Sequence, residues 1–186
     1  MTDLINNAGV STPDHPHETV ATIVRERMME VFNVNIASVA AVTSSCGVLD
    51  SPGGKVTSHS HHQHHQSHYQ HYYDHLQFQV VNISSGMGSL TSVGQFPGVQ
   101  GGGSPSYRCS KAALNMLTVC FSKQFPDTTF AMVHPGWVQT DMGGSAGRTA
   151  DIGVEESVAG IVRVLRSLEG SQSGHFLDWQ GKQLPF

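Results

Sequence analysis

The sequence has few charged residues, and positive charge is especially scarce. Only 13% of its 186 residues are charged, about half the ~25% usual in soluble proteins, and Lys and Arg together number 10. A protein that binds nucleic acid electrostatically needs a footprint of lysine and arginine. The formal net charge of -4 therefore argues against a nucleic-acid partner.

Long apolar runs and paired cysteines are also missing. No run of about 18 apolar residues occurs, so a transmembrane helix is not expected. The three cysteines, Cys46, Cys109 and Cys120, are odd in number and show no CxxC spacing, which excludes a disulfide framework and a zinc ribbon. The first residues have neither a basic nor an apolar signal segment. We therefore expect a reduced, cytoplasmic protein with no membrane partner.

What the chain does contain is an alternation of apolar segments. Strands are predicted at 3–10, 78–85, 128–134 and 175–178, and helices at 17–45, 107–125 and 154–168. Asn33 and Asn35 interrupt the first helix. The second has an apolar stripe made of Ala113, Leu114, Leu117, Cys120 and Phe121. Strands that alternate with helices predict an α/β fold with a parallel sheet.

Histidine is abundant, and most of it lies in one stretch. The chain has 12 His against 10 Lys and Arg, and the stretch from 57 to 73 is almost entirely Ser, His, Gln and Tyr. Such a segment cannot bury enough apolar surface to become ordered, so we expect a disordered loop. Joining Lys55 to Val80 would give a natural lead into the next strand. We therefore interpret 56–79 as a low-complexity insertion, such as a retained intron translated in frame, which sequencing the transcript would test.

A metal site in this stretch is the alternative interpretation. The pairs His61/His65 and His64/His68 have i,i+4 spacing, and neutral imidazoles bind zinc, copper or nickel. A specific site also needs fixed geometry and supporting hydrogen bonds, which low-complexity sequence does not supply. No specific metal site is predicted.

A tyrosine and a lysine are placed for acid–base chemistry. Tyr107 and Lys111 are i,i+4 neighbours on a predicted helix, and a nearby cation would lower the phenol pKa from about 10. An exposed helical pair with no function is the alternative. Polar or glycine-rich residues also follow three predicted strands, at 6–9, 84–85 and 134–140. The carboxyl ends of parallel strands are where α/β sheets bind ligands.

In order, these motifs resemble those of the short-chain dehydrogenase/reductase family. They are Asn6-Asn7-Ala8-Gly9, Val34-Asn35, Asn82-Ile83-Ser84-Ser85, Tyr107-x-x-x-Lys111 and Pro135-Gly136-x-x-x-Thr140. Three longer segments, 84–89, 134–144 and 176–181, are similar to its sniffer-like, C-signal-like carbonyl reductase branch. The resemblance covers nearly everything except the histidine-rich stretch.

The resemblance implies a Rossmann-like parallel sheet with flanking helices, NADP or NAD as cofactor, and a small carbonyl or alcohol substrate. It also implies that helix 107–125 could make subunit contacts in a homo-oligomer. Tyr107 would transfer the proton, Lys111 would lower its pKa and hold the nicotinamide ribose, and Ser85 would bind the carbonyl. Asn35 would hold a water linking Lys111 to solvent. The implied cofactor-binding residues are Asn7, Ala8, Gly9, Tyr107, Lys111, Pro135, Gly136 and Thr140.

Two features of the family pattern are missing. The sequence has no glycine-rich turn to receive the pyrophosphate at a helix N-terminus, and no residue in the position that separates NAD from NADP. We therefore interpret 1–186 as a partial domain that lacks the first three strand–helix units and leaves one strand edge open. Cofactor binding is expected to be weak and activity impaired. The alternative is a catalytically inactive fragment or interaction protein of the same fold.

Overall fold

Four parallel strands form one sheet in the computed structural model. The structure describes residues 2–11, 18–46, 78–95, 103–144 and 149–186. The strands are β1 (Thr2–Asn6), β2 (Phe78–Ile83), β3 (Thr128–His134) and β4 (Phe176–Asp178), and they lie in chain order across the sheet. Each neighbouring pair is parallel. Since parallel neighbours need crossover connections, this arrangement confirms the predicted α/β class.

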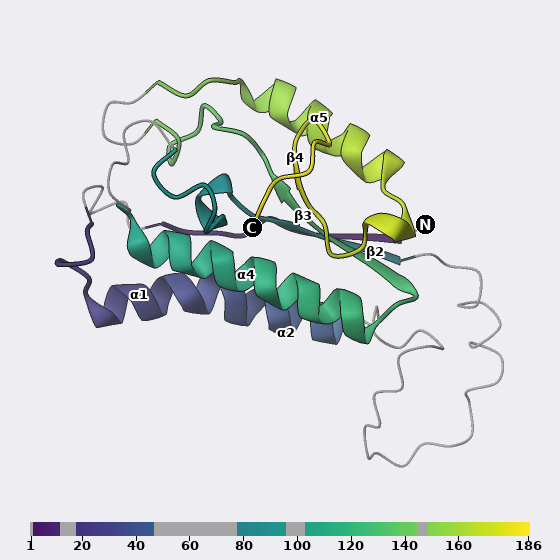
Figure 1. Ribbon diagram of the computed structural model, residues 1–186, viewed down its shortest axis with the longest axis horizontal. Coiled ribbons are helices and arrows are strands. Elements are labelled where there is room, and N and C mark those ends of the chain that lie inside the picture. Colours follow the sequence, from purple (N-terminus) through teal and green to yellow (C-terminus); the bar gives the residue numbers. More distant parts are fainter. Residues whose placement is uncertain (1, 12–17, 47–77, 96–102, 145–148) are drawn as a thin grey trace, which may run out of the picture.

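Helices cover the two faces of the sheet unequally (Figure 1). On one face lie α4 (Pro105–Gln124) and a long helical segment, and on the other lies α5 (Val154–Ser167). The long segment consists of α1 (Arg25–Phe32), a π-helical turn η1 (Asn33–Ala37) and α2 (Ser38–Ser45). Short 3-10 turns are η2 (Gly86–Gly88) and η5 (Gly170–Gln172).

The first helix begins later than the predicted residue 17. The Thr22 amide donates to the Thr19 carbonyl at 3.0 Å, and the Thr22 hydroxyl accepts from the Thr19 amide at 2.9 Å. This local turn competes with a helix, so α1 starts only at Arg25. The predicted interruption by Asn33 and Asn35 takes the form of the π-helical turn η1, and the helical path continues through it.

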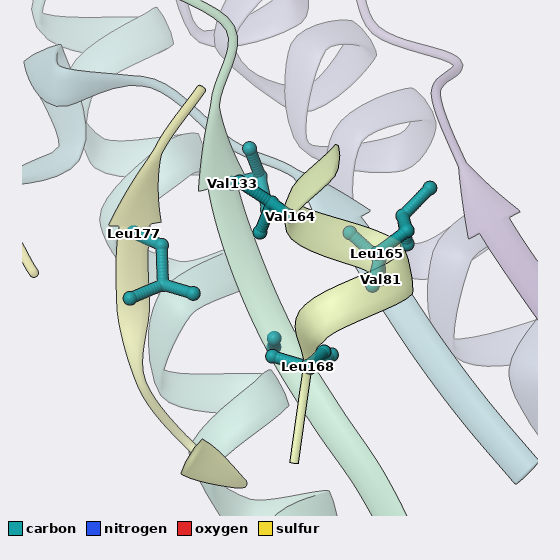
Figure 2. Packing of buried hydrophobic residues seen from close by; sticks show 7 residues of the cluster. Val81, Val133, Val164, Leu165, Leu168 and Leu177 are labelled. Atoms are coloured by element: carbon teal, nitrogen blue, oxygen red, sulfur yellow. The ribbon is translucent and has the colours of Figure 1, made fainter. Parts of the chain in front are cut away.

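Apolar clusters lie on both faces of the sheet. Figure 2 shows Val164 and Leu165 of α5, and Leu168 just after that helix, packed over Val133 and Leu177 of the strands. On the opposite face the cluster contains Phe78, Val80, Phe125 and Phe130, with Leu4 and Phe121 packed against it. The central strands β2 and β3 are therefore covered on both faces, as expected of a parallel sheet.

The outer strand β1 is less covered than its neighbour. Within the described residues it pairs only with β2, and Ile5 is 46% exposed. This agrees with the predicted open edge. In the same described ranges, no helix is long and apolar enough to cross a membrane.

The predicted insertion overlaps the sheet at one end. Phe78 and Gln79 lie in β2, where Phe78 joins the aromatic cluster and the Gln79 Nε2 donates to the Leu168 carbonyl at 3.2 Å. The rest of that segment, 56–77, lies outside the described residues, and so do the paired histidines considered as metal ligands.

Candidate functional site

The carboxyl ends of the first three strands lie at one edge of the sheet. Asn6 is opposite Asn82, and Ile83 is opposite Val133. The Ser84 amide extends the ladder by donating to the Val133 carbonyl at 2.8 Å. The segments that leave β1, β2 and β3 therefore start together, which places the polar strand ends of the sequence at a common edge.

Tyr107 and Lys111 lie in the first turns of α4, which begins at this edge (Figure 1). Lys111 is only 3% exposed, and its Nζ donates to the Ile83 carbonyl at 2.9 Å. The same Nζ lies 5.8 Å from the centre of the Tyr107 ring. The burial of Lys111 rules out the alternative of an exposed helical pair.

The Tyr107 phenol contacts the Ser85 side chain. Burial raises the pKa of Tyr107 above its usual value, and the hydrogen bond with Ser85 only partly offsets this rise. The shift is opposite to the lowering expected from Lys111, because burial disfavours the charged phenolate. Tyr107 is therefore protonated at neutral pH.

Lys111 is shifted in the direction that burial imposes on a cation. Desolvation lowers its pKa to about 8. At pH 7 most of the molecules still carry the ammonium charge, and the Ile83 carbonyl is its hydrogen-bond acceptor. The site therefore combines a protonated phenol with an adjacent buried cation.

Asn35 connects three elements from inside the π-helical turn. Its side chain is fully buried and donates to the Val10 carbonyl and the Ser110 hydroxyl, both at 2.9 Å. It also accepts from the Val10 amide at 2.8 Å. A π-helical turn is a frequent feature of functional sites, and here it brings Asn35 to the loop after β1.

Gly9 completes this side of the site. A Cβ added at Gly9 would lie 3.3 Å from Lys111 Nζ and 3.5 Å from Asn35 Oδ1. Gly9, Asn35 and Lys111 are thus immediate neighbours. Asn7 and Ala8, the two residues before Gly9, are exposed.

A close approach between η2 and α4 holds Ser85 near Tyr107. Ser85 precedes η2, and its Oγ accepts from the Met87 amide at 3.2 Å. A Cβ added at Gly88 would lie 2.8 Å from the Lys111 carbonyl carbon and 3.0 Å from the Ala112 nitrogen. The absence of a side chain at Gly88 therefore lets this turn lie against the helix backbone.

Pro135, Gly136 and Thr140 follow the third strand end. The Ser157 hydroxyl donates to the Pro135 carbonyl at 2.6 Å, which ties this turn to α5. Thr140 is exposed, and its Oγ1 accepts from the Gly143 amide at 3.1 Å. These three residues share the sheet edge with Ser85 but lie one strand further across the sheet.

Sequence reasoning missed a chain of buried polar side chains behind the site. Asn6 Nδ2 donates to Asn82 Oδ1 at 2.8 Å and to Thr43 Oγ1 at 3.2 Å. Asn82 Nδ2 then donates to Thr118 Oγ1 at 2.8 Å. The chain links β1, β2, α2 and α4. The available signal was an asparagine within an otherwise apolar strand.

Among the described residues, no group of three or more His, Cys, Asp or Glu side chains is arranged to hold an ion. The described site carries hydroxyl, amide and ammonium groups, from Tyr107 and Ser85, Asn35, and Lys111.

Known proteins are similar to this chain in sequence and in fold. The chain is 41% identical to C-signal of Myxococcus xanthus over 110 residues, which are 58% of this chain and 61% of that protein. It is 27% identical over 174 residues to the short-chain dehydrogenase anuI of Penicillium roqueforti, covering 90% of this chain and 57% of anuI. The NADPH-bound carbonyl reductase from chicken fatty liver superposes with a TM-score of 0.76 at 31% identity, covering 100% of this chain and 66% of that one.

The chain belongs to the short-chain dehydrogenase/reductase family. The similarity to C-signal and to carbonyl reductases confirms the predicted branch of that family. No protein-family model matches the chain. This short-chain dehydrogenase/reductase chain spans 61% of C-signal and 66% of the chicken enzyme, so its sheet is incomplete relative to theirs.

Proposed function

We propose that this chain carries the carbonyl-reducing site of an NAD(P)-dependent oxidoreductase. The observation that carries the proposal is the protonated Tyr107 phenol held against Ser85, with the Lys111 ammonium beside its ring. A small aldehyde or ketone is the proposed substrate class. The carbonyl reductases among the solved structures support this choice.

The residues present fit the nicotinamide end of a dinucleotide. At Gly9 a side chain would press against Lys111 and Asn35, so glycine lets the loop after β1 lie close to both polar groups. The residues proposed to line the cofactor are Asn7, Ala8, Gly9, Tyr107, Lys111, Pro135, Gly136 and Thr140. A bound NAD(P)H supplies the hydride, while the chain orients the reactants and moves the proton. The NADPH in the chicken enzyme supports NADPH as the first cofactor to test.

Tyr107 is proposed as the proton donor. Because burial keeps its phenol protonated at neutral pH, Tyr107 can give a proton to a carbonyl oxygen as negative charge develops there. Ser85 Oγ is proposed to donate a hydrogen bond to the same oxygen, and the Lys111 cation stabilises the phenolate that remains. The reverse reaction needs the phenolate at the start. At neutral pH the protonated phenol is therefore present, which is the form that starts the reduction.

Asn35 is proposed to support the site from behind. Its side chain makes three hydrogen bonds with Val10 and Ser110, which fix the loop after β1 relative to α4. The implied water between Asn35 and Lys111 remains part of the proposal.

Weak cofactor binding is also proposed for these 186 residues by themselves. The sequence contains no glycine-rich turn to bind the pyrophosphate through a helix N-terminus. Those fixed hydrogen bonds contribute much of the affinity for a dinucleotide. If cofactor binding is lost altogether, the chain is a catalytically inactive fragment or an interaction protein of the same fold.

The location and assembly of the chain are further parts of the proposal. Cys46, Cys109 and Cys120 are free and exposed, which supports a reducing compartment such as the cytoplasm. Homo-oligomer contacts through α4 are supported by Met116, which is 65% exposed on that helix.

A reductase assay with purified full-length chain tests the proposal. NADPH oxidation is followed at the cofactor's absorbance with a panel of small aldehydes, ketones and quinones. We expect slow turnover that falls by at least about 100-fold in Tyr107→Phe, because the phenol proton is lost. Cys109→Ser, an exposed change on the same helix, is the matched control and should keep wild-type turnover.

Calorimetric titration with NADPH separates binding from chemistry. We expect a dissociation constant weaker than about 1 μM, since the pyrophosphate contacts are missing. Equal turnover in wild type and Tyr107→Phe would refute the catalytic proposal. A dissociation constant of about 1 μM or tighter would refute the proposed weakness, and no binding at all would favour the inactive fragment.

A further inference from the structure

A buried glutamate from a distant segment caps the helix that carries Tyr107. Glu18 Oε2 accepts from the Ser106 amide at 3.0 Å, and Glu18 Oε1 accepts from the Ser106 hydroxyl at 2.7 Å, across a sequence separation of 88 residues. Both residues are buried, with Glu18 4% and Ser106 0% exposed. Burying a carboxylate is costly unless it is well hydrogen-bonded, so these two bonds need to be made.

This cap replaces the local one that a helix usually carries. Ser104 occupies the N-cap position but makes no side-chain capping bond, and its backbone is left-handed with φ 58°. Its amide donates to the Glu18 backbone carbonyl at 2.9 Å. Glu18 thus satisfies two backbone amides at the start of α4 and puts a carboxylate beside the positive end of the helix dipole.

Ser106 immediately precedes Tyr107. Its backbone and its hydroxyl are both fixed by one carboxylate, so the first turn of α4 has little freedom to rotate or slide. The Tyr107 phenol reaches Ser85 from this turn. In Figure 1 the segment before α1 lies beside the start of α4, at the edge where the strands end.

We propose that Glu18 is a positioning residue that sets the Tyr107 phenol against Ser85, and so couples the segment between β1 and α1 to proton transfer. Glu18 acts through Ser106 and does not touch the reacting atoms. The expected effect of Glu18 on turnover rests on the proposed function. The expected effect of Glu18 on the Tyr107 phenol rests only on the contacts of Glu18.

A cap that only stabilised the fold would give a different outcome. It would lower the melting temperature when removed, but the molecules that remain folded would keep the wild-type kcat. A positioning residue changes kcat per folded molecule, because a displacement of about 1 Å at a reacting group can cost up to 100-fold in rate.

Three variants separate these roles. Glu18→Ala removes both acceptors. Glu18→Gln removes the charge but keeps a group whose Oε1 can accept from the Ser106 amide while its Nε2 donates to the Ser106 hydroxyl. Glu169→Ala is the matched control: Glu169 also caps a helical turn, η5, which precedes β4, and within the described residues it makes no hydrogen bond to Ser106 or Tyr107.

Turnover is measured in the full-length variants at a temperature where each is folded. We expect kcat in Glu18→Ala to fall by at least about tenfold with KM for the carbonyl nearly unchanged, and Glu18→Gln to restore most of the loss. Glu169→Ala should lower the melting temperature without changing kcat. Wild-type kcat in folded Glu18→Ala would overturn the proposal.

The phenol itself gives a second readout that needs no activity. Ultraviolet titration of each variant, with the same variant carrying Tyr107→Phe subtracted, reports the Tyr107 hydroxyl alone. We expect its pKa to fall toward 10 in Glu18→Ala, as the loosened turn exposes the phenol to water, and to stay close to wild type in Glu18→Gln.

Turnover and the Tyr107 titration test the proposed function and the role of Glu18 separately. If wild type shows no reductase activity, the proposed function fails, and the titration still decides the role of Glu18. An unchanged Tyr107 pKa in folded Glu18→Ala would overturn the inference. Equal shifts in Glu18→Gln and Glu18→Ala would also overturn it, since the carboxylate charge alone would then explain them.

Discussion

Adding one methyl group at Gly88 should move the η2 turn, which follows Ser85, away from α4, which carries Tyr107 and Lys111. The Cβ of Gly88→Ala would lie 2.8 Å from the Lys111 carbonyl carbon and 3.0 Å from the Ala112 nitrogen. Carbon atoms in favourable contact are about 3.5–4.0 Å apart, so the nearest contact is short by roughly 1 Å. Both of these atoms belong to the α4 backbone and cannot rotate away. Either η2 or α4 has to move.

The cost follows from ordinary overpacking. Extra methyl groups in a tight interior destabilise by about 1–3 kcal/mol. In a protein of this size each kcal/mol lowers the melting temperature by about 2–4 °C. We therefore expect Gly88→Ala to melt about 2–12 °C below wild type. Turnover should fall as well, since the displacement moves Ser85 away from the helix that carries Tyr107.

Thermal unfolding of purified protein, followed by circular dichroism, measures the effect. Gly153→Ala is the matched control, because nothing lies within 4 Å of a Cβ added there and its φ is an ordinary -75°. Its melting temperature should stay within about 2 °C of wild type. If Gly88→Ala melts no lower than Gly153→Ala, the contact between η2 and α4 is not tight and the reasoning is wrong.

Two further changes test the interior around the site. Asn35→Ala removes three hydrogen bonds and leaves Val10 and Ser110 without that partner, so urea unfolding should show a loss of about 2–4 kcal/mol; a loss under about 1 kcal/mol would contradict this. Burial lowers the pKa of His134 to about 4, with the Asp178 carboxylate opposing the shift. Because the unfolded chain then binds more protons between about pH 6.5 and 4, stability should fall as the pH drops through that range. In His134→Asn the loss of unfolding free energy across this pH range should be smaller by about 1–3 kcal/mol, as measured by unfolding at several pH values. An unchanged pH dependence would refute the assignment.

Local patterns predicted most of the elements because apolar periodicity reflects which face is buried. The strand at 128–134 and the helix starting at Val154 were predicted with the observed starts. The helix around Tyr107 was predicted two residues late, although Pro105 at its first position is a local signal for a helix start. Its cap comes from Glu18, which is distant in the sequence.

The site was less predictable than the fold. The predicted stripe on α4 included Cys120, which is exposed, whereas the buried face carries polar residues such as Asn115 and Thr118. These side chains face the strand ends, where Ser84 Oγ donates to Asn115 Oδ1 at 2.6 Å. Hydrophobic periodicity locates apolar faces, so it cannot locate a helix face that is buried but carries polar, hydrogen-bonded side chains. The raised pKa of Tyr107 depends on burial, which spacing along the chain does not report.

The hydrogen bond from Lys111 to a backbone carbonyl has a consequence for how the charge at the site depends on pH. A lysine held by a carboxylate loses its partner when acid protonates that group, but the Ile83 carbonyl does not titrate. The ammonium therefore keeps its acceptor at every acidic pH at which the sheet is folded. It discharges only toward alkaline pH, near its pKa of about 8. While the protein is folded, the Lys111 charge beside Tyr107 is thus lost only at alkaline pH. At acidic pH the charge keeps its hydrogen-bond acceptor for as long as the end of β2 stays folded.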